Sequence, residues 1–296
     1  MKIPNFFLIG AMRSGTTSLY NYLSQHPEIF MSEIKEPNYF ACDDKDIDGV
    51  NHPYTICNFK EYIALFTNVD QEKAIGEASH TYLYSSLAPK RIFDFNSEAK
   101  ILVILRNPAE RAFSHYLFLR RLGYETAESF EKALELEEER VKKRKGFGHY
   151  IRRGFYFRQL KRWYDIFPKN QIKVCLYDDL QKDPLTLIQN IYKFLEVDPY
   201  FKPDISLKSH PSGIVRNKFL YSLYRYGQKK QKLIKKLLPS KIYLYLKKVG
   251  YYVLNKSIKK PQLRSETKKK LIEIYKEDIL NLQGLIERDL SNWLKV

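Results

Sequence analysis

A glycine-rich loop between an apolar run and a helical pattern is the feature of this sequence that most restricts its fold. Residues 6–23 read FFLIGAMRSGTTSLYNYL, with Gly10 and Gly15 at the two ends of the loop. A strand that ends in such a loop and opens a helix directs backbone N–H groups and the positive end of the helix dipole at one point, which suits an anion. The sequence therefore predicts an α/β fold with an anion site at the end of its first strand.

This loop differs at one position from the phosphate loop of nucleoside triphosphatases. That pattern, G-x-x-x-x-G-K-[ST], has a lysine where this chain has Thr16, and Arg13 lies inside the loop instead. The lysine contacts the terminal phosphates of ATP, so its absence counts against a P-loop kinase. We therefore expect the loop to hold a different kind of phosphate.

A second stretch, ILVILRNPAERAFSHY at residues 101–116, has the residues of a further phosphate contact. Arg106 stands at the end of a β-branched run, and Ser114 follows about two helical turns later. The planar fork of an arginine fixed at a strand end suits a phosphate. An arginine at a strand end, taken alone, more often closes a structural ion pair. Arg106 therefore indicates a phosphate site only in combination with the glycine loop.

Alternating strand and helix patterns over the first two hundred residues predict a parallel sheet with helices on both faces. We expect a single domain over 1–296, a P-loop-like three-layer α/β/α fold with a basic helical insertion late in the chain. Strands are expected at 5–10, 73–79, 100–106 and 172–180. Helices are expected at 16–27, 107–122, 127–145 (highly charged and solvated), 156–168, 184–197 and 265–294.

Taken in order, these motifs resemble the nucleotide-dependent sulfotransferases, in particular the heparan-type glycan enzymes and their bacterial relatives. IGAMRSGTTSL resembles the 5′-phosphosulfate loop of that family and LRNPAERAFSHY its 3′-phosphate strand and helix. HPEIF followed by KEPNYF, and RDLSNW near the end, are similar to further family elements. The resemblance implies a sulfuryl donor, 3′-phosphoadenylyl sulfate, and no metal.

The resemblance also implies which residues bind this donor. Arg13 stands where family members usually carry lysine, and there it would stabilise the leaving phosphate electrostatically. Arginine does not readily release a proton, so we do not expect it to act as a general acid. The implied donor-binding residues are Arg13, Ser14, Gly15, Thr16, Thr17, Arg106, Ser114, Tyr156, Ser212, Gly213, Arg216 and Asn217.

Transfer to a hydroxyl or an amine requires a base beside the attacking atom. The family comparison implies Glu36, which precedes Pro37 in KEPNYF, and His80 in GEASHTYLY is the competing candidate. Ala78 and Asn38 stand where heparan-type members often carry lysine and histidine. We therefore expect a carbohydrate acceptor whose structure the sequence does not specify.

The positive charge of this chain is concentrated late in the sequence. The chain has a net charge of +17, and residues 216–270 hold 18 Lys or Arg against the single acid Glu266. This segment, with Tyr and Leu interleaved, could hold a polyanionic glycan, lie on an anionic membrane that presents a lipid-linked glycan, bind nucleic acid, or be a solvated helical face. Of the three binding roles, its amphipathic character favours peripheral membrane contact over nucleic acid.

The cysteines and the apolar runs bear on location. Cys42, Cys57 and Cys175 form no C-x-x-C pair and cannot all be paired, so a reducing compartment without a zinc site is the simpler interpretation. No run approaches the roughly 18 apolar residues of a membrane span. The N-terminal apolar run leads straight into the glycine loop, which indicates a strand rather than a signal peptide. We expect a cytoplasmic protein that lies peripherally at the inner membrane face.

Three functions are consistent with these patterns. The favoured one is sulfuryl transfer to a hydroxyl or amine, with a carbohydrate as the expected acceptor. The alternatives are a P-loop nucleotide kinase and a noncatalytic anion- or nucleic-acid-binding protein that uses residues 216–270. Binding by the last would depend strongly on salt and would not require Arg106.

Overall fold

The core of the fold is a parallel sheet of five strands. The computed structural model describes residues 2–44, 55–143, 147–206, 213–215, 258–259 and 261–296. The strands are β1 (Phe6–Leu8), β2 (Ile29–Met31), β3 (Ala74–Ala78), β4 (Lys100–Leu105) and β5 (Ile172–Leu176). They lie in the order β2-β3-β1-β4-β5, and every neighbouring pair is parallel. The predicted parallel sheet is confirmed, and β2 is a strand that we did not expect.

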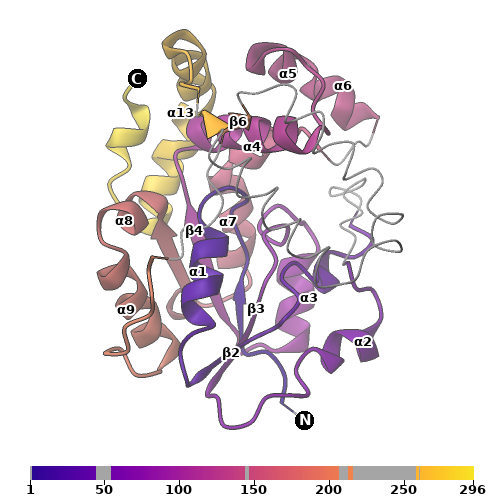
Figure 1. The fold of residues 1–296 in the computed structure, drawn as a ribbon, viewed down its shortest axis with the longest axis vertical. Helices are drawn as coiled ribbons and strands as arrows, with labels where there is room; N and C mark the ends of the chain where they lie inside the picture. The colour runs from indigo at the N-terminus through magenta and orange to yellow at the C-terminus, as the bar shows by residue number, and fades with distance from the viewer. Residues whose placement is uncertain (1, 45–54, 144–146, 207–212, 216–257, 260) are drawn as a thin grey trace.

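Helices cover both faces of the sheet and give the predicted three layers (Figure 1). One face packs against α1 (Thr16–Leu23), α8 (Tyr177–Lys182) and α9 (Pro184–Leu195), and the other against α3 (Ala88–Phe95), α7 (Tyr156–Tyr164) and α13 (Ser265–Ile286). The other elements are α2 (Phe59–Ala64), α4 (Pro108–Leu122), α5 (Phe130–Glu135), α6 (Glu137–Lys142), η1 (Tyr39–Ala41), η3 (Arg152–Gly154), η4 (Lys169–Gln171), η5 (Ser291–Leu294) and the antiparallel pair of β6 (Ile214–Val215) and β7 (Ile258–Lys259).

All of β1 and the residues of β4 after Lys100 are apolar and buried, because both faces of these two strands are covered. On β1, Phe7 packs toward α7 and α13 while Phe6 and Leu8 pack toward α1 and α9. On β4, Val103 lies in the core on the α7 and α13 side, and Leu102 lies in the core on the α1 and α9 side. This is the burial that a continuous apolar run predicts for a parallel strand, in place of an alternation of apolar and polar residues.

The prediction of one charged, solvated helix at 127–145 is wrong in two respects. The segment forms two short helices, α5 and α6, separated at Leu136, and residues 144–146 lie outside the description. It is also not wholly solvated, because Arg140 donates to both oxygens of the fully buried Glu125 at 2.7 and 2.8 Å. The Tyr150 hydroxyl donates to the same carboxylate at 2.5 Å. This buried ion pair holds the segment against the body of the protein.

Two other predicted elements are shorter in the structure. The strand expected over 172–180 ends at Leu176, where α8 begins. The last helix ends at Ile286, because Glu287 takes a left-handed conformation (φ 52°), and the chain continues into η5.

The C-terminal turn η5 is tied to the start of α4. Asn107 caps α4 through its side-chain oxygen, and its amide nitrogen donates to the Trp293 carbonyl at 3.1 Å. The Trp293 indole in turn donates to Asp178 at 2.9 Å. The chain's last turn therefore supports the strand end that carries Arg106.

The basic segment lies largely outside the described part of the chain. Residues 216–257 and 260 are not described, so the expected contact of 216–270 with an anionic membrane stays a prediction. Among the described residues, no helix is both long enough and apolar enough to span a bilayer.

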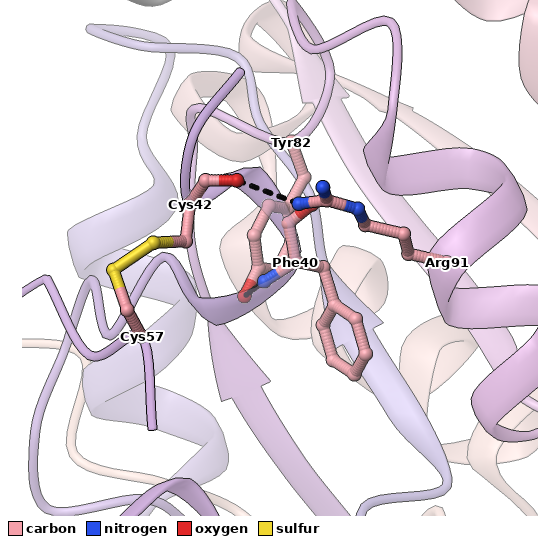
Figure 2. Close-up of a disulfide and its surroundings, with 5 residues drawn as sticks. All are labelled: Phe40, Cys42, Cys57, Tyr82 and Arg91. Carbon is pink, nitrogen blue, oxygen red and sulfur yellow. Dashed lines mark hydrogen bonds between the residues drawn. A yellow bond between two sulfur atoms is a disulfide. The ribbon is translucent and has the colours of Figure 1, made fainter. Parts of the chain in front are cut away.

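Two of the three cysteines are paired, which the interpretation of a reducing compartment did not anticipate. Cys42 and Cys57 form a disulfide, with their Cα atoms 5.7 Å apart (Figure 2). Cys175 is free and buried. The separation of 15 residues between Cys42 and Cys57 did not reveal the pairing, because it arises where η1 meets the segment before α2. The disulfide removes the cysteine argument for a reducing compartment, so the cytoplasmic location stays a prediction without that support.

We expect alkylation of the unfolded, unreduced protein to modify one cysteine, Cys175, and alkylation after reduction to modify all three. The reason is that the disulfide consumes two of the three thiols. Intact-mass spectrometry counts the adducts. A Cys42→Ser control should carry two adducts without reductant, and three adducts on the unreduced wild type would contradict the bond.

Candidate functional site

The glycine loop is bound to the central strand β4. The Ala11 amide donates to the Ile104 carbonyl at 2.7 Å, and the Ile104 amide donates to the Gly10 carbonyl at 2.8 Å. Gly10 has a φ of 154°, and a Cβ there would lie 2.8 Å from Leu83 Cβ and 3.3 Å from the His80 carbonyl oxygen. The loop therefore packs on the turn after β3, and Gly10 permits the close approach.

The N-terminus of α1 has the geometry of an anion site. Gly15, at φ 106°, is its N-cap, and no side chain caps the helix within the described residues. Ser14 is fully buried, and its hydroxyl oxygen makes no hydrogen bond to any described residue. Thr16 is buried and Thr17 is half-buried in the first turn. Helix N–H groups without a cap, next to a buried hydroxyl without a partner, favour an anionic ligand.

The structure brings the loop and α4 together, although about a hundred residues separate them in sequence. Arg13 Nε donates to Ser114 Oγ at 3.3 Å, and the Arg13 guanidinium lies 4.6 Å from the centre of the Phe118 ring. Arg106 donates to Glu110 at 2.9 and 3.3 Å and stacks 4.6 Å over the Tyr177 ring. Both predicted stretches thus meet at the carboxyl edge of β1 and β4.

Tyr156 closes this part of the site as the first residue of α7. It is fully buried, and its hydroxyl makes no hydrogen bond within the described structure. Burial raises the pKa of Tyr156, and the neighbouring Arg111, Ser14 and Arg106 oppose that rise. Tyr156 thus lies near Ser14 and Arg106, and its assignment to the donor site stays a prediction.

Glu36 and His80, the two candidate bases, form one unit. The His80 amide donates to Glu36 Oε2 at 2.8 Å, and His80 Nδ1 lies 2.5 Å from the same oxygen. The other carboxylate oxygen, Oε1, is paired with Lys35. Both residues lie at the carboxyl end of β3, since the Glu36 amide donates to the Ala78 carbonyl at 2.9 Å.

The protonation of this pair follows from its surroundings. Burial would raise the pKa of Glu36, but His80 and Lys35 outweigh it and hold that pKa below its usual range. Burial lowers the pKa of His80, although Glu36 opposes the shift. An ionised Glu36 requires Nδ1 of His80 to be the donor, so the neutral imidazole leaves Nε2 as its acceptor atom.

A buried carboxyl group that the sequence interpretation missed lies beneath this pair. Glu77 of β3 accepts hydrogen bonds from Tyr82 (2.6 Å), Tyr62 (3.2 Å) and Ser79 (2.7 Å). Burial raises the pKa of Glu77 to about 7, against these hydrogen bonds. Ser79 Oγ accepts from the Asn38 amide at 3.1 Å, and so Glu77 supports the turn that carries Glu36.

Three more basic residues at this edge were also missed. Arg111 and His115 lie on α4, and Arg153 lies in η3, three residues before Tyr156; all three are at least nine-tenths buried. Arg111 donates to the Tyr150 carbonyl, but its Nε and Nη1 have no hydrogen-bond partner among the described residues. The sequence signals that could have revealed them are the place of Arg111 and His115 inside the 101–116 stretch and the place of Arg153 just before Tyr156.

The late predicted donor contacts are mostly outside the described chain. Ser212, Arg216 and Asn217 lie there, and Gly213 is described as a buried residue before β6. Their assignment to the donor site stays a prediction.

Both a family model and a solved structure match this chain. A family model described as the sulfotransferase domain matches residues 4–211. A crystal structure of a sulfotransferase from Alicyclobacillus acidocaldarius is 31% identical, with a TM-score of 0.78 and coverage of 100% of both chains.

Curated proteins of known name match as well. Bifunctional heparan sulfate N-deacetylase/N-sulfotransferase 4 of Mus musculus is 26% identical over 99% of this chain and 31% of its own length. Membrane-associated sulfotransferase kil1 of Dictyostelium discoideum is 24% identical over 77% of this chain and 64% of its own length. The match spans less than a third of that heparan sulfate relative.

We expect the stability of the wild type to fall between about pH 4.5 and pH 7 through Glu77. Over this range Glu77 loses its proton in the unfolded chain, where its ordinary pKa is 4.5, but keeps that proton in the folded chain. Glu77→Gln cannot ionise and still accepts from both tyrosines. Its unfolding free energy relative to wild type should therefore rise with pH, by at most about 3 kcal/mol.

Urea unfolding at pH 5 and pH 8 measures this difference. The exposed Glu98→Gln is the matched control and should show no such rise. A Glu77→Gln curve parallel to that control would show that Glu77 ionises normally.

Proposed function

This chain belongs to the sulfotransferase family, and on that premise we propose that it transfers a sulfuryl group from 3′-phosphoadenylyl sulfate to a hydroxyl or amine of a carbohydrate. One contact carries the proposal: the glycine loop packs directly on the turn that holds the Glu36–His80 pair. The approach is so close that a Cβ atom on Gly10 would lie 3.3 Å from the His80 carbonyl oxygen. A phosphosulfate bound at the loop would then face a base, which is the arrangement that group transfer requires.

The residues at the loop fit this donor. The unpartnered hydroxyls of Ser14 and Tyr156 and the uncapped α1 N-terminus offer donors for one 5′-phosphate. Arg106 and Ser114 lie one strand away, where a separate 3′-phosphate would bind. Such a donor has no β- and γ-phosphates, which accounts for the loop having Thr16 in place of lysine.

The proposed acceptor is a glycan, as in the relatives named for heparan sulfate. The match spans only part of those relatives, so both the glycan and the choice between O- and N-sulfation belong to the proposal. A lipid-linked glycan presented at an anionic membrane is the form that residues 216–270 would favour.

In the proposed reaction the acceptor oxygen or nitrogen attacks sulfur while the bond from sulfur to the 5′-phosphate oxygen breaks. Arg13 stabilises the negative charge that develops on the leaving phosphate. The acceptor proton goes to the Glu36–His80 pair. Glu36 was the expected base, but its low pKa and its engaged oxygens make it a weak proton acceptor.

His80 Nε2 is the better-suited atom of the pair. It accepts the proton, while Glu36 holds the ring through Nδ1 and stabilises the imidazolium that forms. The lowered pKa of His80 keeps Nε2 unprotonated at neutral pH.

Calorimetry with 3′-phosphoadenosine 5′-phosphate tests the donor site. Wild type should bind it more tightly than ATP, and Arg106→Ala and Arg13→Ala should each weaken binding roughly 10-fold or more, since each loses a charge-assisted hydrogen bond. Arg288→Ala removes the same charge from a partly exposed pair with Asp179 and should bind like wild type. A wild type that prefers ATP would support a kinase instead.

The pH dependence of kcat/KM tests the base. We expect the rate to fall as acid protonates His80, with a midpoint below the ordinary histidine pKa of 6.5. His80→Asn should lose roughly 10²- to 10⁴-fold. Glu36→Gln should lose less and move the midpoint to lower pH, because the carboxylate that raises the pKa of His80 is gone. A His80→Asn enzyme with near-normal turnover and an inactive Glu36→Gln would assign the proton to Glu36.

A further inference from the structure

Arg153 is a buried cation without a counter-ion in the described structure. Its side chain belongs to a residue that is 4% exposed, and its Nε and Nη2 make no hydrogen bond to any described residue. Its guanidinium lies 4.5 Å from the centre of the Tyr84 ring, which offsets part of the cost of burial. An aromatic ring supplies no hydrogen-bond acceptor in the plane of the guanidinium, so those donors stay unused.

The surroundings of Arg153 place it at the reacting edge of the sheet. Tyr84 follows His80 by four residues on the turn against the glycine loop, and the Tyr84 hydroxyl contacts His149 at 3.3 Å. The charge of Arg153 interacts with several ionisable neighbours: Tyr84, Glu36, His80, His115, Arg111 and Glu137.

The negative groups nearby are already engaged. Glu36 is held by Lys35 and His80. Glu137 accepts the backbone amides of Ile151 (2.6 Å) and Arg152 (2.9 Å). Neither carboxylate forms an ion pair with Arg153 or Arg111 in the described residues, which leaves two buried guanidinium groups with unused donors.

A guanidinium that is buried and unpaired destabilises a fold unless a ligand supplies the missing charge. We propose that Arg153, supported by Arg111, binds an oxyanion at the reacting centre, either the sulfuryl oxygens of the donor or a carboxylate of the acceptor. This inference rests on the proposed function and adds to it a residue outside the predicted donor and base sets. The planar fork of arginine suits both groups, so an experiment must separate them.

The test compares Arg153→Gln with Arg152→Gln, which makes the same change at the exposed neighbouring residue. Calorimetry measures binding of 3′-phosphoadenylyl sulfate and of 3′-phosphoadenosine 5′-phosphate, two probes that differ only by the sulfuryl group. Initial rates are measured with a uronic-acid glycan and with the same glycan after its carboxyl groups are reduced to alcohols. The shift in melting temperature with inorganic sulfate gives a readout that requires no turnover.

If the donor supplies the oxyanion, Arg153→Gln should weaken binding of the sulfated probe roughly 10-fold more than binding of the bisphosphate. If the acceptor supplies it, both nucleotides should bind normally, and KM should rise for the acidic glycan but not for the reduced one. In either case inorganic sulfate should stabilise the wild type and Arg152→Gln more than Arg153→Gln, and Arg153→Lys should restore part of the effect.

Two results would overturn the proposal. One is an Arg153→Gln protein that matches Arg152→Gln in every assay. The other is a lower melting temperature without ligand together with unchanged ligand binding, which would make Arg153 a structural residue. A wild type that binds neither nucleotide would instead refute the proposed function, and the sulfate assay would still report on Arg153.

Discussion

Two backbone hydrogen bonds between the glycine loop and β4 determine where every other part of the site lies. Ala11 and Gly10 bond to Ile104, so the loop leaves β1 along the neighbouring strand rather than away from the sheet. The start of α1 is then held beside α4, where Arg13 reaches Ser114. The close approach at Gly10 brings the turn after β3 to the opposite side of the loop. Three strand ends thus meet around the loop that we predict to bind an anion, as expected where connections of a parallel sheet diverge.

Charge balance explains what kind of ligand such a site accepts. Arg106 has Glu110, and Glu36 has Lys35 and His80. Arg111 and Arg153, in contrast, are buried without a counter-ion among the described residues. Positive charge that is already desolvated and held in place contributes more to binding than a flexible surface lysine does. A ligand with several negative groups therefore gains most at this edge of the sheet.

The parts of the fold that the sequence predicted are those with a local signal. The loop, the β4 run and the helix from Pro108 to Gly123 each carry their own pattern of apolar residues, prolines and glycines. Contacts made only through tertiary structure were missed. Arg153 looked like one of two adjacent arginines, and only burial distinguishes it from Arg152. The Cys42–Cys57 bond depends likewise on how η1 packs, which spacing in the sequence does not encode.

The Glu36 turn shows how these tertiary contacts serve the chemistry. Glu36 (φ 67°) and Asn38 (φ 55°) both take left-handed conformations on either side of Pro37, at a cost of roughly 1–3 kcal/mol each. Such a turn persists only where its surroundings hold it.

Several contacts restrain this turn from outside. Ser79 accepts from the Asn38 amide, the Tyr82 hydroxyl accepts from the Phe40 amide at 3.4 Å, and Arg91 donates to the Phe40 and Cys42 carbonyls at 3.3 and 2.6 Å (Figure 2). Ser79 and Tyr82 in turn donate to Glu77. The strained turn is therefore restrained on the side of β3 and on the side of α3. Because the carboxylate is oriented before any acceptor arrives, the Glu36–His80 pair would need little reorganisation in the proton transfer that we propose.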